Sequence, residues 1–288
     1  MGQKTKNFIL ISSFAVFFVV SYLVIIYAFG WQFDFKNFKW QETGGILVKA
    51  NTDGVRVFVN DELKGKTSFL SNTFTQKNLL PGGYALLLKK DGLSELVKNI
   101  EVRSGEAGQL VHLYLAEAGE INDFIAGSEP KKENPDYFIN KTDGLLYRTL
   151  TSGEVEKISS ESVYIKDFRL KVLQKNIYLA SSDTAAPGVF LLNEDLWEQV
   201  HSLPTADLLL SPDNKKLAIV GPAQITVLWL KNENEPPYFE KDHKETIKTG
   251  EKIKEALWFK TGWHIIYLTE DGQIRFLEID PTGGRNDL

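Results

Sequence analysis

The side chains that could do chemistry are few and scattered. The sequence has no cysteine and four histidines, His112, His201, His243 and His264. No two histidines are four residues apart and no His-Glu-x-x-His occurs, so no helix turn presents a pair of imidazoles to zinc. The lack of cysteine removes disulfides, thiolate metal ligands and cysteine nucleophiles together. We therefore expect no metal site and no cofactor.

Motifs of common enzymes are also missing from the sequence. It contains no Gly-x-Ser-x-Gly, no Gly-x-x-x-x-Gly-Lys-Ser/Thr and no Gly-x-Gly-x-x-Gly. A Ser-His-Asp triad or a pair of carboxylates could still be assembled from distant residues. Because no pattern of an α/β catalytic domain accompanies them, we expect that the chain is not an enzyme.

Aromatic side chains are the remaining candidates for ligand contact. Four tryptophans fall in the C-terminal half: Trp197, Trp229, Trp258 and Trp263. Tryptophan is favoured at protein interfaces and against sugar rings, but large aromatics also dominate hydrophobic cores. We take the four as a candidate contact surface, with core packing as the alternative.

The turn from Ser211 to Lys215 contains an aspartate and an asparagine, so a calcium loop is the functional alternative for it. Calcium takes six to eight oxygen ligands, and one aspartate with one asparagine supplies too few. Pro212 instead presets φ for a type I turn that Asp213 caps. We expect a plain turn.

An apolar segment runs from Phe8 to Phe29 without one charged residue, and it would position the rest of the chain. As a helix it is about 33 Å long, enough to cross the roughly 30 Å hydrocarbon core of a bilayer. Lys4 and Lys6 precede it and aromatic residues follow it, which predicts a cytoplasmic N-terminus and an extracytoplasmic bulk. The alternative is a cleaved signal peptide ending near Gly30, although the apolar run exceeds the usual length of about 7–15 residues.

Residues 44–115 show the alternation of half-buried strands, broken by turn residues. Turns are predicted at Asn51–Gly54, which would join a hairpin, at Asn60-Asp61 and at Asp91-Gly92. The run from Gly54 to Asp61, then Gly65-Lys-Thr, Leu80-Pro-Gly-Gly-Tyr and Lys90-Asp-Gly, resembles a PEGA domain. That resemblance implies a small antiparallel β-sandwich of a kind common in bacterial surface proteins.

Residues 116–135 are rich in Gly, Pro and charge and predict a linker, with one helical turn at residues 121–125. Beyond it, residues 136–288 carry a weak repeat. Strands at Tyr137, Ile177, Leu217 and Ile265 recur at a spacing of about 40 residues, each followed by a turn and a second strand. With the Ser211–Lys215 turn, this pattern resembles TolB-like and WD40-like propellers. We expect a partial propeller of about four blades, either an open arc or a piece of a larger one.

The predicted fold is thus mostly β: a short cytoplasmic tail (1–7), one transmembrane helix (8–29), a PEGA-like sandwich (44–115), a linker (116–135) and propeller-like repeats (136–288). The formal net charge of −5 gives no sign of nucleic-acid binding. We expect a non-catalytic, single-pass cell envelope protein that is anchored in the membrane through Phe8–Phe29 and binds other envelope proteins. Binding of cell-wall glycan is the alternative, and a hydrolase built from loops comes third.

Overall fold

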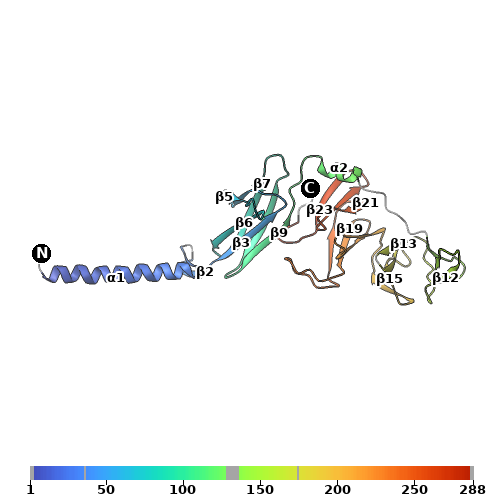
Figure 1. Ribbon diagram of the computed structural model, residues 1–288, viewed down its shortest axis with the longest axis horizontal. Coiled ribbons are helices and arrows are strands. Elements are labelled where there is room, and N and C mark those ends of the chain that lie inside the picture. Colours follow the sequence, from blue (N-terminus) through green and yellow to red (C-terminus); the bar gives the residue numbers. More distant parts are fainter. Residues whose placement is uncertain (1–2, 36, 128–135, 174, 286–288) are drawn as a thin grey trace. The chain divides into compact units, whose positions relative to one another are not determined.

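The computed structural model describes residues 3–35, 37–127, 136–173 and 175–285 (Figure 1). These residues form two helices and 23 strands, so the chain is mostly β as predicted. They divide into two compact units, each of which is treated by itself. The first unit comprises residues 3–118 together with Pro281–Gly284, and the second comprises residues 119–280 together with Arg285.

The first unit begins with helix α1, Gln3–Ala28. Its segment Asn7–Ala28 is long and apolar enough to cross a membrane, and none of its most apolar stretch is buried against the rest of the chain. A signal sequence near the N-terminus would share these properties. Ser13 Oγ donates a hydrogen bond to the Ile9 carbonyl oxygen at 2.8 Å, so this hydroxyl is satisfied within the helix. The side chains of Lys4 and Lys6, on which the predicted orientation depends, lie outside the described residues.

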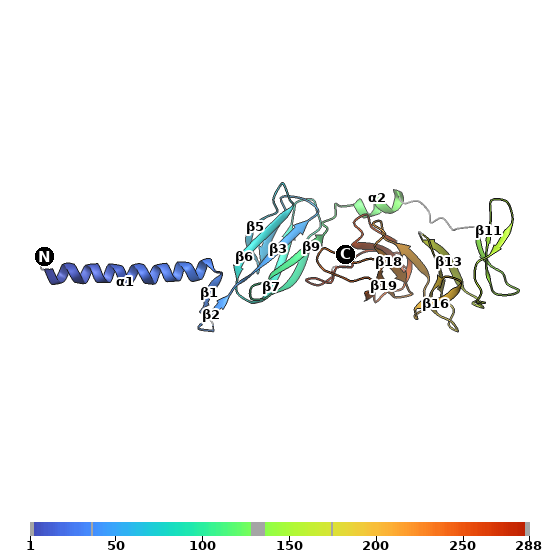
Figure 2. The ribbon, with the colours of Figure 1, turned by 60° about the horizontal axis from the view of Figure 1, so that its bottom comes forward.

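A small hairpin that the sequence did not predict follows the helix (Figure 2). Strands β1 (Trp31–Asp34) and β2 (Lys39–Glu42) pair antiparallel, with Trp31 opposite Glu42 and Asp34 opposite Lys39. The Gly30 carbonyl oxygen accepts hydrogen bonds from Thr43 N at 2.7 Å and from Thr43 Oγ1 at 2.6 Å, and these close the base of the hairpin. The sequence showed the aromatic residues here, but their close spacing gave no sign of a turn.

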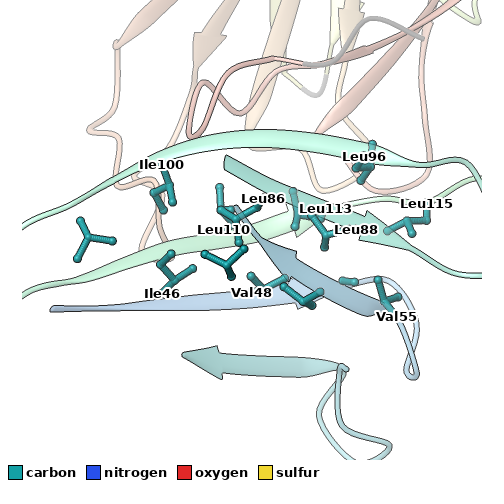
Figure 3. Packing of buried hydrophobic residues seen from close by; sticks show 14 residues of the cluster. Ile46, Val48, Val55, Leu86, Leu88, Leu96, Ile100, Leu110, Leu113 and Leu115 are labelled. Atoms are coloured by element: carbon teal, nitrogen blue, oxygen red, sulfur yellow. The ribbon is translucent and has the colours of Figure 1, made fainter. Parts of the chain in front are cut away.

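The predicted sandwich is formed by two sheets, with strand orders β6–β3–β9 and β5–β4–β7–β8. Its strands are β3 (Gly44–Ala50), β4 (Arg56–Val59), β5 (Glu62–Lys66), β6 (Thr73–Leu79), β7 (Gly82–Lys89), β8 (Leu96–Val102) and β9 (Ala107–Leu113). Alternate apolar residues of both sheets meet in one core, in which Ile46, Val48, Leu86, Leu88 and Leu110 are fully buried (Figure 3). This is the alternation that the sequence pattern required.

Two details of the predicted sandwich are wrong. The sheet is not purely antiparallel, because β3 and β9 pair in parallel, with Val48 opposite Leu110. The Asn51–Gly54 turn does not close a hairpin either, because β3 and β4 belong to different sheets. Gly54 does adopt the positive φ that its turn needs, at 65°. Local alternation cannot reveal such pairings, because the partner of β3 comes from the far end of the module.

The chain returns to the first unit near its C-terminus. Asn99 N in β8 donates a hydrogen bond to the Gly283 carbonyl oxygen at 2.8 Å. The neighbouring Lys98 is fully buried, and its Nζ donates to the carbonyl oxygens of Thr282 and Gly284. A buried ammonium group requires such acceptors, so the returning segment completes the edge of this sheet.

The second unit contains four antiparallel sheets, each made of consecutive strands. Each of the four predicted strand pairs is present as a hairpin within its own sheet: β10–β11, β14–β15, β18–β19 and β22–β23. The strands are β10 (Tyr137–Ile139), β11 (Leu146–Thr149), β12 (Val155–Lys157), β13 (Phe168–Leu173), β14 (Asn176–Ser181), β15 (Gly188–Asn193), β16 (Leu196–His201), β17 (Asp207–Leu210), β18 (Lys216–Val220), β19 (Gln224–Trp229), β20 (Lys244–Lys248), β21 (Ile253–Trp258), β22 (His264–Thr269) and β23 (Ile274–Glu278).

Apolar residues fill the spaces between successive sheets of this unit. One core cluster joins sheet β13–β16 to sheet β17–β20 through Tyr178, Val189, Leu208 and Leu217. A second and larger cluster joins sheet β17–β20 to sheet β21–β23. Sheets β13–β16, β17–β20 and β21–β23 therefore bury apolar residues against one another in chain order.

Part of the predicted linker is helical. Helix α2, Glu120–Gly127, includes the predicted turn and extends beyond it on both sides. The Phe124 ring packs edge-on against Phe259 with centroids 4.9 Å apart, and Glu120 forms an ion pair with Lys260 at 2.8 Å. Residues 116–118 of the segment thus belong to the first unit and residues 119–127 to the second, while residues 128–135 of the predicted linker lie outside the described residues.

Candidate functional site

The four tryptophans do not form a shared exposed surface. Trp229, Trp258 and Trp263 are buried in the core between sheets β17–β20 and β21–β23. Trp258 Nε1 donates a hydrogen bond to the Leu209 carbonyl oxygen at 2.8 Å, which satisfies its polar atom within that core. Trp197 is half-buried in β16, apart from the other three. The predicted contact surface is therefore wrong for three residues, because large rings fill the space between stacked sheets.

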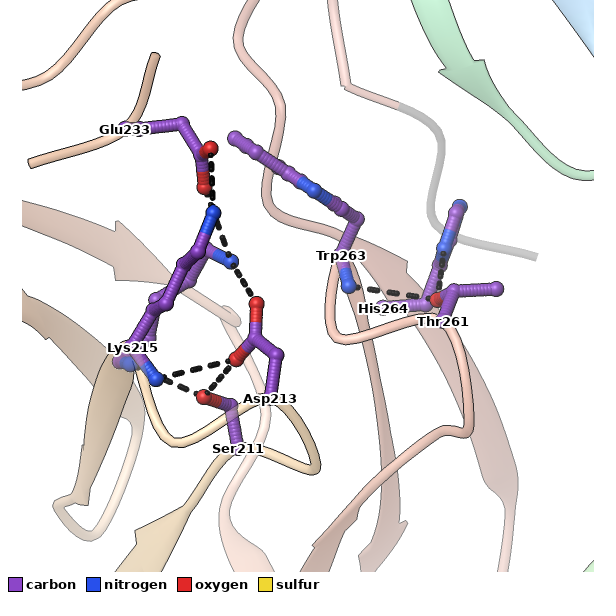
Figure 4. Close-up of polar contacts among 8 residues, drawn as sticks. Ser211, Asp213, Lys215, Glu233, Thr261, Trp263 and His264 are labelled. Carbon is purple, nitrogen blue, oxygen red and sulfur yellow. Dashed lines mark hydrogen bonds and ion pairs between the residues drawn. The ribbon is translucent and has the colours of Figure 1, made fainter. Parts of the chain in front are cut away.

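A buried polar cluster lies beside Trp263 instead (Figure 4). At its centre is the Lys216 side chain, which has no exposed surface. Its Nζ lies 3.1 Å from Asp213 Oδ2 and 3.5 Å from Glu233 Oε2, and 4.3 Å from the centroid of the Trp263 ring. The Lys215 Nζ binds the other oxygen of Glu233 at 3.0 Å. Sequence reasoning missed this site because Glu233 comes from the loop between β19 and β20.

The turn that presents these lysines is closed by its own side chains. Ser211 Oγ donates to Asp213 Oδ1 at 2.5 Å and accepts from Lys216 N at 2.9 Å. Lys215 N donates to the same Asp213 oxygen at 3.1 Å, and Asn214 takes a left-handed φ of 57°. Both carboxylate oxygens of Asp213 thus already accept hydrogen bonds from the protein. The Ser211 hydroxyl and the Asp213 carboxylate thus cap the turn that the sequence predicted.

Hydrogen bonds and neighbouring charges favour the ionised forms of Asp213 and Lys215 in this cluster. Burial raises the pKa of Asp213, but hydrogen bonds from Ser211 and Lys215 and the charge of Lys216 outweigh it, so the pKa lies below its ordinary value. The hydrogen bond to Glu233 raises the pKa of the Lys215 ammonium group. Two cations and two carboxylates face one another, and their formal charges cancel. The cluster can therefore fix three turns of the second unit in place, but it offers no spare charge to an outside ligand.

The histidines lie in different surroundings. His264 is buried, stacks on Phe276 with centroids 4.8 Å apart and shares a hydrogen bond of 2.9 Å with Thr261 Oγ1. His112 is half-buried in β9. Burial first and the nearby Lys244 second lower the pKa of His201. Within the described part of the chain, no three His, Asp or Glu side chains gather as a metal site.

The His243 ring lies among aromatic neighbours. It stacks on Phe239 with centroids 4.5 Å apart, and it lies 5.2 Å from the Trp229 ring. Its Nε2 atom is 3.5 Å from Glu245 Oε2. This arrangement packs the loop between β19 and β20 onto its own sheet.

Comparison with known proteins gives little support to a named family. No protein-family model matches the chain, so neither the PEGA nor the TolB-like resemblance has a family match behind it. No curated protein matches the sequence. Among solved structures, the chain resembles the crystal structure of a candidate 6-phosphogluconolactonase from Bacteroides uniformis, at 16% identity and a TM-score of 0.35, over 84% of this chain and 83% of that one.

This comparison corrects one expectation. We expected the chain not to be an enzyme, and the Bacteroides uniformis protein is named as one. We therefore withdraw the exclusion of catalysis. The low TM-score and identity carry no argument for any particular reaction of this chain.

Proposed function

We propose that the chain is a single-pass membrane protein of the cell envelope whose extracytoplasmic β modules bind other envelope proteins. In this proposal α1 is an uncleaved anchor with its N-terminus in the cytoplasm. Residues 44–115 are a PEGA-like module, and the four sheets of the second unit are blades of a propeller-like array.

The observation that carries this proposal is the surface of α1. Its apolar side chains are exposed all round the helix, for example Phe8, Phe18 and Val24. Leaving apolar surface in water costs about 25 cal/mol for each Å², so a helix of this composition is stable only if something covers it. A bilayer covers all sides at once, and every backbone polar group inside the helix is already satisfied there.

The β modules support the second half of the proposal. The loop between β5 and β6 carries Phe69 and Leu70, whose exposed fractions are 82% and 93%. This loop is held by hydrogen bonds: Ser68 N donates to the Thr73 carbonyl oxygen at 2.8 Å, and the Ser68 and Ser71 hydroxyls are 2.8 Å apart. Two large apolar side chains on a braced loop favour contact with another protein, because ordering entropy has already been lost.

Photo-crosslinking in intact cells tests this function. A photoreactive residue at Leu70 of the full chain should give an adduct of one defined mass, whereas the same residue at Lys77, exposed on β6, should not. The chain should stay in the membrane pellet after alkaline extraction and keep its N-terminal mass. Release into the supernatant would refute the anchor, and a membrane-bound chain without an adduct at Leu70 would refute protein binding by this module.

Glycan binding, the alternative from the sequence, gains no support from the site. It depended on exposed tryptophans for stacking on sugar rings, and three of the four are buried.

A further inference from the structure

The hairpin β1–β2 combines a braced turn with an exposed aromatic surface. Asp34, at the end of β1, is buried, with only 6% of its surface exposed. Its carboxylate accepts hydrogen bonds from Asn37 N at 3.2 Å, from Asn37 Nδ2 at 2.7 Å and from Gln41 Nε2 at 3.0 Å. A carboxylate with several donors fixes the turn, so the side chains that the turn carries are presented in one arrangement.

Those side chains are large and apolar. Phe33 lies at the centre, with ring centroids 5.1 Å from Phe35, 6.4 Å from Phe38 and 5.4 Å from Trp40, all in edge-to-face contact. Phe35 and Phe38 are nevertheless 79% and 80% exposed. An aromatic cluster of this kind leaves most of its apolar area in water unless another phase covers it.

The hairpin lies at the C-terminal end of the helix (Figure 2). An open, mostly apolar groove of about 660 Å³ has Leu23 and Tyr27 of α1 on one side and Phe33, Phe35 and Trp40 of the hairpin on the other. Leu23 lies more than one helical turn before the end of α1 at Ala28. The hairpin side chains therefore reach the level of the last helical turns, which belong to the apolar segment.

We propose that the β1–β2 hairpin inserts as a wedge into the membrane interface. Its groove then holds a phospholipid acyl chain of the leaflet in which the C-terminal end of α1 lies. This inference rests on the proposed anchor. Continuity with the helix selects lipid as the occupant, because any bilayer that covers Leu23 and Tyr27 also reaches the groove. Tryptophan and its aromatic neighbours favour this boundary, where one side of the ring is apolar and the other is wet.

The net charge of the hairpin indicates which lipids suit a binding test. Between Gly30 and Thr43 the sequence has two acidic residues, Asp34 and Glu42, and two basic residues, Lys36 and Lys39, so the formal net charge is zero. No attraction to anionic headgroups follows from this balance. Zwitterionic phosphatidylcholine vesicles are therefore a sufficient probe.

The absence of cysteine from the chain makes a depth measurement direct. We would reconstitute the full chain in phosphatidylcholine vesicles and attach a nitroxide to single cysteines in the variants Phe38→Cys, Val19→Cys and Phe69→Cys. Val19 lies within α1, and Phe69 matches Phe38 in exposure but sits on the loop between β5 and β6. Oxygen, which concentrates in the acyl region, and a water-soluble nickel complex both relax the electron spin of the nitroxide. The relaxation that each of them causes is then compared at every labelled position.

The proposal expects a several-fold higher ratio of oxygen to nickel accessibility at Phe38 than at Phe69, approaching the ratio at Val19. Equal ratios at Phe38 and Phe69, with Val19 shielded from nickel, would overturn the wedge and leave the anchor intact. Exposure of all three labels to nickel would overturn the anchor and the wedge together. A Phe35→Cys label repeats the measurement with Phe38 in place, so local damage to the cluster does not decide the outcome.

Discussion

Replacing Lys216 by methionine should destabilise the second unit specifically. Methionine has a similar length and can fill the same space, but it removes the ammonium group. The change leaves Glu233, which is only 4% exposed, without its 3.5 Å partner and Asp213 without its 3.1 Å partner. It also removes the cation from the face of the Trp263 ring, 4.3 Å away.

The expected loss of unfolding free energy depends on which partners Glu233 and Asp213 retain in the variant. Removing one partner of a buried ion pair costs about 3–5 kcal/mol when the other charge is left alone. Here Glu233 retains Lys215 at 3.0 Å, and the Asp213 side chain is 35% exposed. We therefore expect a loss of about 2–4 kcal/mol, including the roughly 0.5–2 kcal/mol of a cation–π contact.

Urea unfolding followed by tryptophan fluorescence measures this loss. Trp229, Trp258 and Trp263 share one core, so their emission reports on the second unit of the full chain in detergent micelles. With a slope of about 2 kcal/mol per M, the midpoint should fall by about 1–2 M urea. Lys215→Met is the matched control, because the Lys215 side chain is 36% exposed and Glu233 keeps the buried Lys216 as a partner at 3.5 Å, so we expect a smaller loss than for Lys216→Met.

The comparison between the Lys216→Met and Lys215→Met variants tests whether the buried ammonium group stabilises the second unit. If Lys216→Met unfolds at the same urea concentration as Lys215→Met, the buried cluster does not hold the turns together and the reasoning above is wrong. A further variant sharpens the test. Adding Glu233→Gln to Lys216→Met removes the stranded charge, and it should restore part of the lost stability.

The remaining predictions concern pH, packing and the returning C-terminal segment. The pKa of Asp213 in the folded chain lies below its ordinary 3.8, so its contribution is complete above about pH 4 and is lost as the pH falls through the folded value. Acid titration of unfolding should show a weaker dependence on pH below about pH 4 in Asp213→Asn than in the wild type. In Gly188→Ala, the new Cβ would lie 2.0 Å from the His201 carbonyl oxygen at a φ of 129°, so we expect a loss of at least about 2 kcal/mol in urea unfolding, and an unchanged midpoint would contradict this. Lys98→Met removes the ammonium group that binds the Gly284 carbonyl oxygen, and limited proteolysis should then cut near Gly284 several-fold faster than in the wild type; equal rates would show that this contact does not retain the segment.

Much of the fold was predictable because the relevant signals are local. The Tyr137, Ile177, Leu217 and Ile265 strands each lie in the structure next to the second strand predicted for them, since neighbours in the chain pair through short turns. The Ser211–Lys215 turn was likewise predictable, because its capping bonds join residues close in sequence.

The features that the sequence did not predict depend on contacts between residues far apart in the chain. The parallel pairing of β3 with β9 and the hydrogen bond of Asn99 with Gly283 join distant parts of the chain. Glu233 reaches Lys216 from another loop, and nothing near either residue in the sequence points to the other. Burial of Trp229 and Trp263 also depends on how sheets stack, which a single strand does not encode.

The sequence by itself determined that the chain begins with a helix apolar on every side and continues in short strands without cysteine or an enzyme motif. These properties depend on residue type and on spacing of a few positions, and the chain carries both directly. Only the tertiary structure decided that the tryptophans are core residues, that a buried lysine joins three turns, and that the aromatic residues after α1 form a braced hairpin beside it. Each of these depends on contacts between segments far apart in the chain, and burial and charge pairing exist only once those contacts have formed.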